Sequence, residues 1–136
     1  MACLTKEKLA EFATVAATMG NGLDARLHVA TGDLSGGQRQ ALSFLMATRL
    51  RPELLLLDEH TAALDPKTSE QLMRVTDQRI REDALTALMI THHLEDAIQY
   101  GNRLIIMSAG KVSLDVAGAD KAKLTVPDLL EYFNRY

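Results

Sequence analysis

A serine, two glycines and a glutamine stand together where a helix is expected to begin, in Leu34-Ser35-Gly36-Gly37-Gln38. Glycines let another group approach the backbone closely, and the free N–H groups and positive dipole of a helix start favour an anion such as phosphate. The Ser35 hydroxyl adds a donor. The Ser-x-x-Gln spacing is also that of a capping box. The segment is therefore a candidate phosphate site, with a plain helix cap as the alternative.

Two adjacent carboxylates follow a run of leucines in the segment Leu54-Leu55-Leu56-Leu57-Asp58-Glu59. The run predicts a short strand, over residues 53–57, that is buried on both faces. Asp58 and Glu59 stand at its carboxyl end, where α/β sheets bind their ligands. One carboxylate there can hold Mg²⁺ with its waters while the other orients or deprotonates a water, as phosphoryl transfer requires. The alternative is a core strand that ends in two solvated charges.

A histidine pair follows the next apolar run, residues 86–91. An imidazole at His92 could contact a γ-phosphate and so sense its presence. The alternative is a polar loop residue, and the adjacent His93 shows how ambiguous a single histidine is. Because all three features are expected at one edge of the sheet, we expect them to form one nucleotide site.

Helices and strands alternate along most of the chain. Thr5, Ser35 and Asp65 are expected to cap helices, because each precedes an apolar stripe with helical spacing. The last helix is expected to begin near residue 125 and to place Leu129, Leu130 and Phe133 on one face. Patterns predict helices over 5–19, 36–50, 65–82 and 94–100, and strands over 53–57, 86–91, 103–108 and 111–116, the last two as a hairpin. This order predicts an α/β fold with a largely parallel sheet and flanking helices, without repeats or a linker.

Composition excludes several classes of protein. A chain of 136 residues has room for one domain with a single core. The chain has 15 Lys and Arg against 18 Asp and Glu and no run of basic residues. It therefore lacks the charge pattern that is typical of nucleic-acid-binding proteins. Cys3 is the only cysteine, so an internal disulfide is impossible and a reducing, cytoplasmic setting is expected. The longest apolar run is too short to span a membrane, and Lys6 and Lys8 interrupt any signal-peptide pattern.

The motifs resemble those of ABC-type ATPases in order and spacing. Residues 34–40 are similar to the signature motif, 54–59 to Walker B, 61–65 to the D-loop, and Thr91-His92 to the switch histidine. Residues 58–68 are similar to those of a branch of bacterial importer ATPases. The resemblance covers nearly the whole chain and implies a P-loop NTPase fold of the ABC ATPase type.

The resemblance also implies that ATP and Mg²⁺ are the ligands. It implies that four signature residues contact the nucleotide phosphates across a dimer interface, namely Ser35, Gly36, Gly37 and Gln38. Asp58 would support Mg²⁺, Glu59 would polarise the attacking water, and His92 would touch the γ-phosphate. Asp65 would communicate between subunits. One departure is His60, where many relatives have proline.

One element of such ATPases is missing from the sequence. A complete domain has a strand and a Gly-x-x-x-x-Gly-Lys-Ser/Thr loop, called Walker A, and no segment here has that spacing. We therefore expect residues 1–136 to be a partial ABC ATPase domain, the C-terminal half, supplied as a fragment or by a split or truncated gene. About 1–50 would form the helical subdomain with the signature motif, and about 51–136 would carry Walker B, the D-loop, the switch histidine and the C-terminal part of the core.

The missing strand has an expected physical cost. In the family's sheet order it lies between the strand that ends at His92 and the strand over 103–108. Its absence would leave two strand edges without a ladder. We expect such a chain to be unstable alone, to self-associate as a homo-oligomer, or to recruit the strand from elsewhere.

The leading hypothesis is the ATP-binding subunit of an ABC transporter, without activity alone. Its partners would be a second ATPase subunit or the missing N-terminal half, together with permease subunits that hold it at the inner face of the cell membrane. No nucleic acid and no direct membrane insertion are expected. The alternative is a non-catalytic module that lends its signature motif to a complete ATPase. A third hypothesis, the head of a chromosome-maintenance or DNA-repair ATPase, is disfavoured because no sustained heptads occur.

Overall fold

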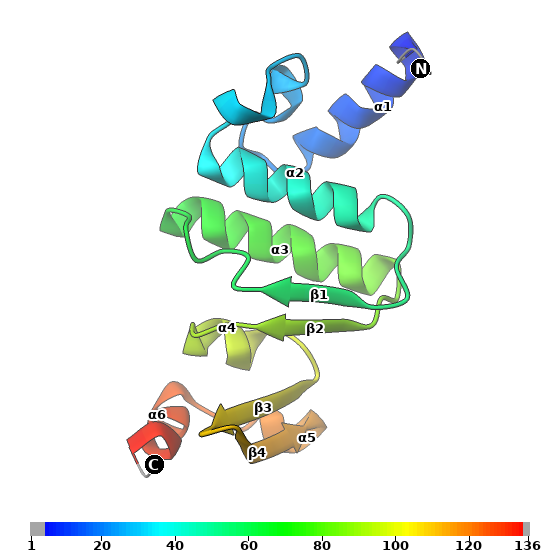
Figure 1. Cartoon of the computed structure of the whole chain (residues 1–136). Coiled ribbons are helices and arrows are strands. Elements are labelled where there is room, and N and C mark those ends of the chain that lie inside the picture. Colours follow the sequence, from blue (N-terminus) through cyan, green and yellow to red (C-terminus); the bar gives the residue numbers. More distant parts are fainter. Residues whose placement is uncertain (1–4, 135–136) are drawn as a thin grey trace. The chain divides into compact units, whose positions relative to one another are not determined.

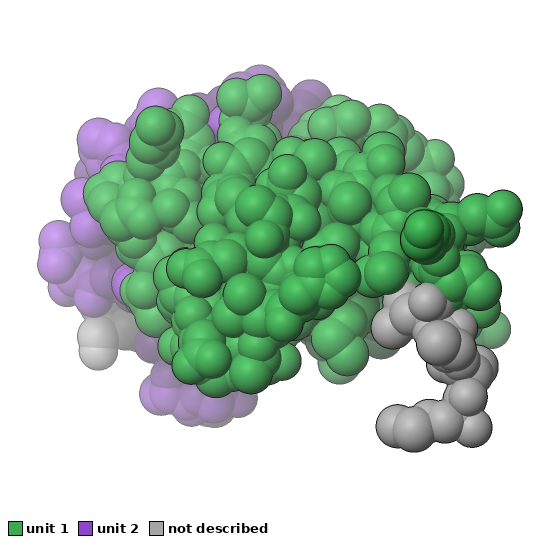
Figure 2. Space-filling view, turned by 90° about the horizontal axis from the view of Figure 1, so that it is seen from above, with its two compact units in different colours: residues 1–89 green, residues 90–136 purple. Residues whose placement is uncertain are grey.

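The computed structural model describes residues 5–134, so Cys3 lies outside the described part. The chain forms two compact units, residues 1–89 and 90–136, coloured separately in Figure 2. The boundary falls inside a strand rather than in a linker. The first unit contains α1 (Lys6–Ala17), η1 (Asp24–Arg26), η2 (Thr31–Asp33), α2 (Gly36–Thr48), β1 (Leu55–Asp58), α3 (Pro66–Glu82) and β2 (Ala87–Ile90), whose last residue begins the second unit. The second continues with α4 (Leu94–Gln99), β3 (Arg103–Ser108), β4 (Lys111–Ala117), α5 (Gly118–Lys121) and α6 (Val126–Asn134).

The three expected helix caps of the first unit are confirmed. The Thr5 hydroxyl accepts from the backbone N–H of Lys8 at 3.3 Å before α1. Asp65 caps α3 by accepting from the N–H of Thr68 at 3.1 Å, and proline occupies the first helical turn. Ser35 caps α2. Local sequence therefore determines where these helices begin, because each cap satisfies a backbone donor that the helix leaves free.

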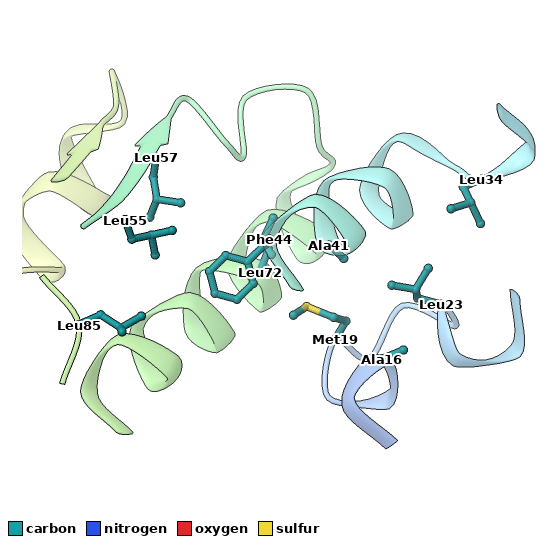
Figure 3. Packing of buried hydrophobic residues seen from close by; sticks show 10 residues of the cluster. All are labelled: Ala16, Met19, Leu23, Leu34, Ala41, Phe44, Leu55, Leu57, Leu72 and Leu85. Atoms are coloured by element: carbon teal, nitrogen blue, oxygen red, sulfur yellow. The ribbon is translucent and has the colours of Figure 1, made fainter. Parts of the chain in front are cut away.

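Strands β1 and β2 are neighbours in one sheet and run in the same direction, with α3 as the connection between them (Figure 1). The strand β1 contributes Leu55 and Leu57 to a core that also includes residues of α1, α2 and α3. Figure 3 shows Phe44 of α2 and Leu72 of α3 near the centre of this cluster. The expected α/β class is confirmed, since a parallel pair with a helical crossover is its basic unit.

The prediction that the strand over residues 53–57 is buried on both faces is wrong, and β2 is likewise exposed on one face. In β1, Leu55 and Leu57 are buried, whereas Leu56 between them is 66% exposed. In β2, Leu88 is 53% exposed, while Met89 packs against the core. Successive side chains of a strand point to opposite faces, and the core with α2 and α3 covers only one of them. A continuous apolar run cannot reveal this, because it gives both faces the same composition.

The second unit is built around an antiparallel hairpin. Strands β3 and β4 pair from Arg103 opposite Ala117 to Ser108 opposite Lys111, as the sequence predicts. Their inward residues Leu104 and Ile106 pack with residues of α4 and α6. This pattern alternates buried and exposed residues along β3, which is typical of a strand covered on one face.

The expected shared face on α6 is wrong. Leu129 is 1% exposed and packs with Tyr132 in the core of the second unit, but Leu130 and Phe133 are 47% and 52% exposed. A helix turns by about 100° per residue, so Leu130 points away when Leu129 points into the core. Residues i and i+3, Leu129 and Tyr132, form the buried stripe instead.

Lys121 in α5 is buried, which the sequence did not indicate. Its Nζ donates to the backbone carbonyls of Ile98 and Tyr100, at 2.5 and 3.0 Å, and so satisfies the end of α4. Burial lowers the pKa of Lys121. The ammonium therefore replaces the missing helical donors at that end.

The tight turn of the hairpin yields a prediction. Ala109 and Gly110 both have positive φ, 47° and 75°, as in the turn type that prefers Asn-Gly. We expect Ala109→Asn to raise the free energy of unfolding by about 1 kcal/mol, because alanine is disfavoured in the left-handed region. Urea denaturation measures the change. Ala122→Asn is the control, since Ala122 has a right-handed φ of −64°; an equal gain in both variants would contradict the explanation.

No helix within residues 5–134 has both the length and the apolar character required to span a bilayer.

Candidate functional site

The start of α2 is a complete capping box. The Ser35 Oγ accepts from the backbone N–H of Gln38 at 3.2 Å, and the Gln38 Oε1 accepts from the N–H of Ser35 at 3.1 Å. The Gln38 Nε2 also donates to the carbonyl of Asn21 at 3.1 Å, while Asn21 donates to the carbonyl of Gly37 at 3.3 Å. Ser35 is exposed and Gln38 is buried. The cap and a ligand site are compatible, because the exposed hydroxyl and helix start face solvent while the buried amide fixes them.

The two glycines of this segment have different surroundings. A Cβ at Gly37 would lie 2.7 Å from the Cγ2 of Thr68 in α3, so the absence of a side chain allows the two helices to approach. A Cβ at Gly36 would meet nothing within 4 Å. Packing therefore explains Gly37, whereas no neighbour among residues 5–134 explains a glycine at position 36. The open position leaves room for an external group at the helix start.

This difference gives a matched pair of variants. We expect Gly37→Ala to lower the free energy of unfolding by about 1 to 3 kcal/mol, because Thr68 must shift to make room. Gly36→Ala should leave it unchanged or raise it by about 0.5 to 1 kcal/mol, since alanine is the better helix former. Thermal or urea denaturation of both variants tests the contrast. Equal destabilisation would contradict the close approach at Gly37.

The carboxylates at the end of β1 are held differently. Asp58 is exposed, as expected for a residue that alternates with buried Leu57. Glu59 is partly buried, its Oε2 is shielded from solvent, and its φ is 48°, in the left-handed region. A turn follows, in which the N–H of Ala62 donates to the carbonyl of Glu59 at 3.0 Å. The chain therefore reverses sharply at Glu59 and leaves both carboxylates at the end of the strand.

The donor set fits Mg²⁺ bound together with a nucleotide. Mg²⁺ usually takes one or two carboxylates and completes its shell with phosphates and waters. Asp58 offers an exposed carboxylate next to Glu59. In residues 5–134 no group of three His, Asp or Glu side chains could hold a metal by itself. A metal at Asp58 would thus depend on ligands from a nucleotide.

Asp65 lies at the start of α3, beside the signature helix. A hydrogen bond from the Thr68 side chain, and a second from its backbone N–H, lower the pKa of Asp65. The same Thr68 is the close neighbour of Gly37. The structure thus connects the expected D-loop to the expected signature segment through one threonine, a contact that sequence spacing does not show.

His92 belongs to the second unit and follows β2. It is exposed, and its ring centre lies 4.4 Å from that of His93, with the planes tilted by 30°. His93 is the N-cap residue of α4, and its N–H donates to the Thr91 hydroxyl at 3.0 Å. The seven other candidate residues, Ser35 to Gln38, Asp58, Glu59 and Asp65, belong to the first unit.

Known proteins are similar to this chain in sequence and in fold. The ABC transporter family matches residues 3–62. The chain is 55% identical over 100 residues, 74% of its length, to the tyrosine transport ATP-binding protein of Clostridioides difficile (strain R20291). The chain belongs to the ABC transporter ATPase family. Another relative, a phosphonates import ATP-binding protein from Alcaligenes faecalis, is 43% identical over 94 residues.

Solved ABC cassettes have the same fold as this ABC transporter ATPase chain. The dimeric structure of MJ0796, a bacterial ABC transporter cassette, matches with a TM-score of 0.65 and 28% identity over 86% of this chain. A post-hydrolysis state of MJ0796 with ADP and Pi matches equally well. The chain spans about half of these cassettes and 40% of the C. difficile relative. The expected P-loop NTPase fold class is thereby confirmed, and ATP is the nucleotide of the family.

Proposed function

We propose that this chain is the part of an ABC importer ATPase that carries the signature motif and Walker B. The observation that supports it most directly is the capped, exposed start of α2, with an open position at Gly36, in a chain that also ends β1 in Asp58-Glu59. A helix start open to phosphate and a carboxylate pair at the end of a strand are the two surfaces that two nucleotides bound across a dimer interface would contact in each subunit. Residues 1–50 would form the helical subdomain of this domain, and residues 51–136 the rest.

Each candidate residue then has a role in ATP binding or hydrolysis. Ser35, Gly36 and Gly37 bind the phosphates of ATP through the hydroxyl and the free N–H groups of the helix start. Buried Gln38 orients this start, in addition to any contact with phosphate. The D-loop residue Asp65 is connected to the signature segment through Thr68 and would signal across a dimer interface.

The hydrolytic step would use the residues after β1 and β2. Asp58 would hold Mg²⁺, which when bound neutralises charge on the phosphate oxygens. Glu59 would accept a proton from the attacking water, as the water oxygen bonds to the γ-phosphorus and the bond between this phosphorus and the bridging oxygen breaks to release ADP and phosphate. His92 would donate a hydrogen bond to the γ-phosphate.

The 136 residues contain no Gly-x-x-x-x-Gly-Lys-Ser/Thr segment. We propose that residues 1–136 alone hydrolyse no ATP, and that they do so together with a segment that carries a Walker A loop. The test mixes the purified chain with such an N-terminal segment from a relative and measures phosphate release. Release by the mixture only is expected. Steady-state release by the chain alone, abolished in Glu59→Gln, would contradict the proposal, as would a mixture that neither associates nor hydrolyses.

A second candidate function is favoured by the same exposed helix start. A module that lends its signature motif to a complete ATPase would use Ser35 and Gly36. Its Glu59 would take no part in ATP hydrolysis. Such a module gains affinity for that ATPase when ATP is added. The role of Glu59 in hydrolysis distinguishes the two functions.

The proposed partners are permease subunits at the inner face of the membrane, because the relatives are named as ATP-binding proteins of transporters for tyrosine, aliphatic sulfonates and phosphonates. These names differ in the solute, so the proposal extends to import but to no particular solute. Co-purification of the chain with a co-expressed permease tests it.

A further inference from the structure

His60, the residue directly after Glu59, contacts a buried hydroxyl of α3. The Nε2 of His60 lies 3.3 Å from the Oγ1 of Thr76, and the two form a hydrogen bond. Thr76 is 2% exposed and His60 is partly buried. A side chain directly after Glu59 is thus attached to a helix residue 16 positions further along the chain.

Thr76 is a firm anchor. It lies within the 17-residue helix α3, whose Leu72 and Met73 are also buried. A hydrogen bond in such a shielded position is stronger than one at the surface, and a helix packed on the core has little freedom to follow a moving loop. The contact therefore restrains His60 rather than Thr76.

The backbone next to this contact is strained. Glu59 has a φ of 48°, which residues other than glycine adopt at a cost, and which persists only when the surroundings enforce it. Inside the turn, the N–H of Ala62 donates to the carbonyl of Glu59, and that of Leu64 to the carbonyl of Thr61. Both hydrogen bonds join residues of the turn to one another and not to the rest of the unit. The bond from His60 to Thr76 is the side-chain link that ties the residue after Glu59 to α3.

We propose that His60 and Thr76 form a positioning pair, which holds Glu59 in its left-handed conformation and thereby aims its carboxylate at the end of β1. Neither residue touches the reacting atoms. The pair acts through the backbone of Glu59, and its importance for hydrolysis rests on the proposed function of Glu59 as the proton acceptor.

The test uses Thr76→Val in the full 136-residue chain, which removes the hydroxyl and keeps the shape of the side chain. Nuclear magnetic resonance reports the backbone conformation of Glu59. A positive φ brings the amide and Hα protons of this residue close together, which gives a strong nuclear Overhauser cross-peak between them. We expect this cross-peak to weaken in Thr76→Val. Hydrogen exchange at the amide of Ala62 should accelerate by about three- to tenfold, the effect of one hydrogen bond of ordinary net strength.

Three further variants make the result specific. Thr76→Ser keeps the hydroxyl and should restore both signals. His60→Phe keeps a ring without the nitrogen and should reproduce the loss, which preserves the test if Thr76→Val does not fold. Thr48→Val is the matched control, because Thr48 is an equally buried helical threonine of the same unit whose hydroxyl donates to the carbonyl of Phe44.

The proposal is overturned if Glu59 keeps its cross-peak in both Thr76→Val and His60→Phe, or if Thr48→Val weakens it to the same extent. These measurements need neither nucleotide nor partner. Their failure would remove the positioning role and leave the proposed function standing, whereas an inactive mixture in the phosphate-release assay would remove the function and leave the conformational role intact.

Discussion

We expect Glu59→Gln to lower ATP hydrolysis by about 10²- to 10⁴-fold, the usual contribution of a general base. The assay uses the chain mixed with a segment that carries Walker A. Glutamine has nearly the same shape as glutamate but cannot accept the proton of the attacking water. Binding of ATP should persist, because the phosphate contacts lie elsewhere. Steady-state phosphate release and equilibrium nucleotide binding, measured on the same mixture, separate the two effects.

The control for this variant is Glu70→Gln. Glu70 is an exposed carboxylate on α3 and loses its charge in the same way. Its variant should hydrolyse ATP at the original rate. If Glu59→Gln also keeps the original rate, hydrolysis takes place at a partner's carboxylate, and the chain only lends its signature face.

Replacing Ser35 with arginine weakens the ATP-dependent association with a partner that bears Walker A by about 100-fold, the size of a hot-spot substitution. The hydroxyl is exposed at the start of α2, so a long side chain there obstructs the surface that ATP and the partner must share. The effect should be present with ATP and small without it. Titration by sedimentation or fluorescence anisotropy, with and without ATP, measures the change.

The loss of a helix cap must be separated from the loss of a contact. Thr5→Arg serves this purpose, because Thr5 is an exposed N-cap in the same unit and accepts a comparable backbone bond. It should lower stability by about 1 kcal/mol and leave association intact. If Thr5→Arg weakens association as much as Ser35→Arg does, the effect reflects folding and not the site.

Much of the fold follows from local sequence. Thr5, Ser35 and Asp65 cap helices at the predicted positions, and Asp65-Pro66 begins α3 as expected. The hairpin and its turn at Ala109-Gly110 also match the prediction. These features depend on a residue and its neighbours within about four positions, which is why a sequence alone reveals them.

The errors concern burial. The run Leu54–Leu57 predicts a strand covered on both faces, and residues 129–133 predict a stripe that includes Leu130 and Phe133; both are wrong. Whether an apolar side chain is buried depends on which elements pack against it. That is a property of the tertiary arrangement, and the run of leucines reads the same whether one face or two are covered.

For the candidate site, too, the sequence shows which chemical groups are present and the structure shows how they are packed. The residue types at Ser35, Asp58, Glu59 and His92 indicated nucleotide chemistry, since a helix start, paired carboxylates and an imidazole are groups that phosphate chemistry uses. Only the structure shows that Thr68 leaves no room for a side chain at Gly37, whereas a side chain at Gly36 would meet no neighbour. It also shows that His60 forms a hydrogen bond with Thr76. Sequence by itself thus determined which groups are present and where local elements begin. Only the tertiary structure decided which of them are packed, exposed or strained, because contacts between residues far apart in the chain are made by folding.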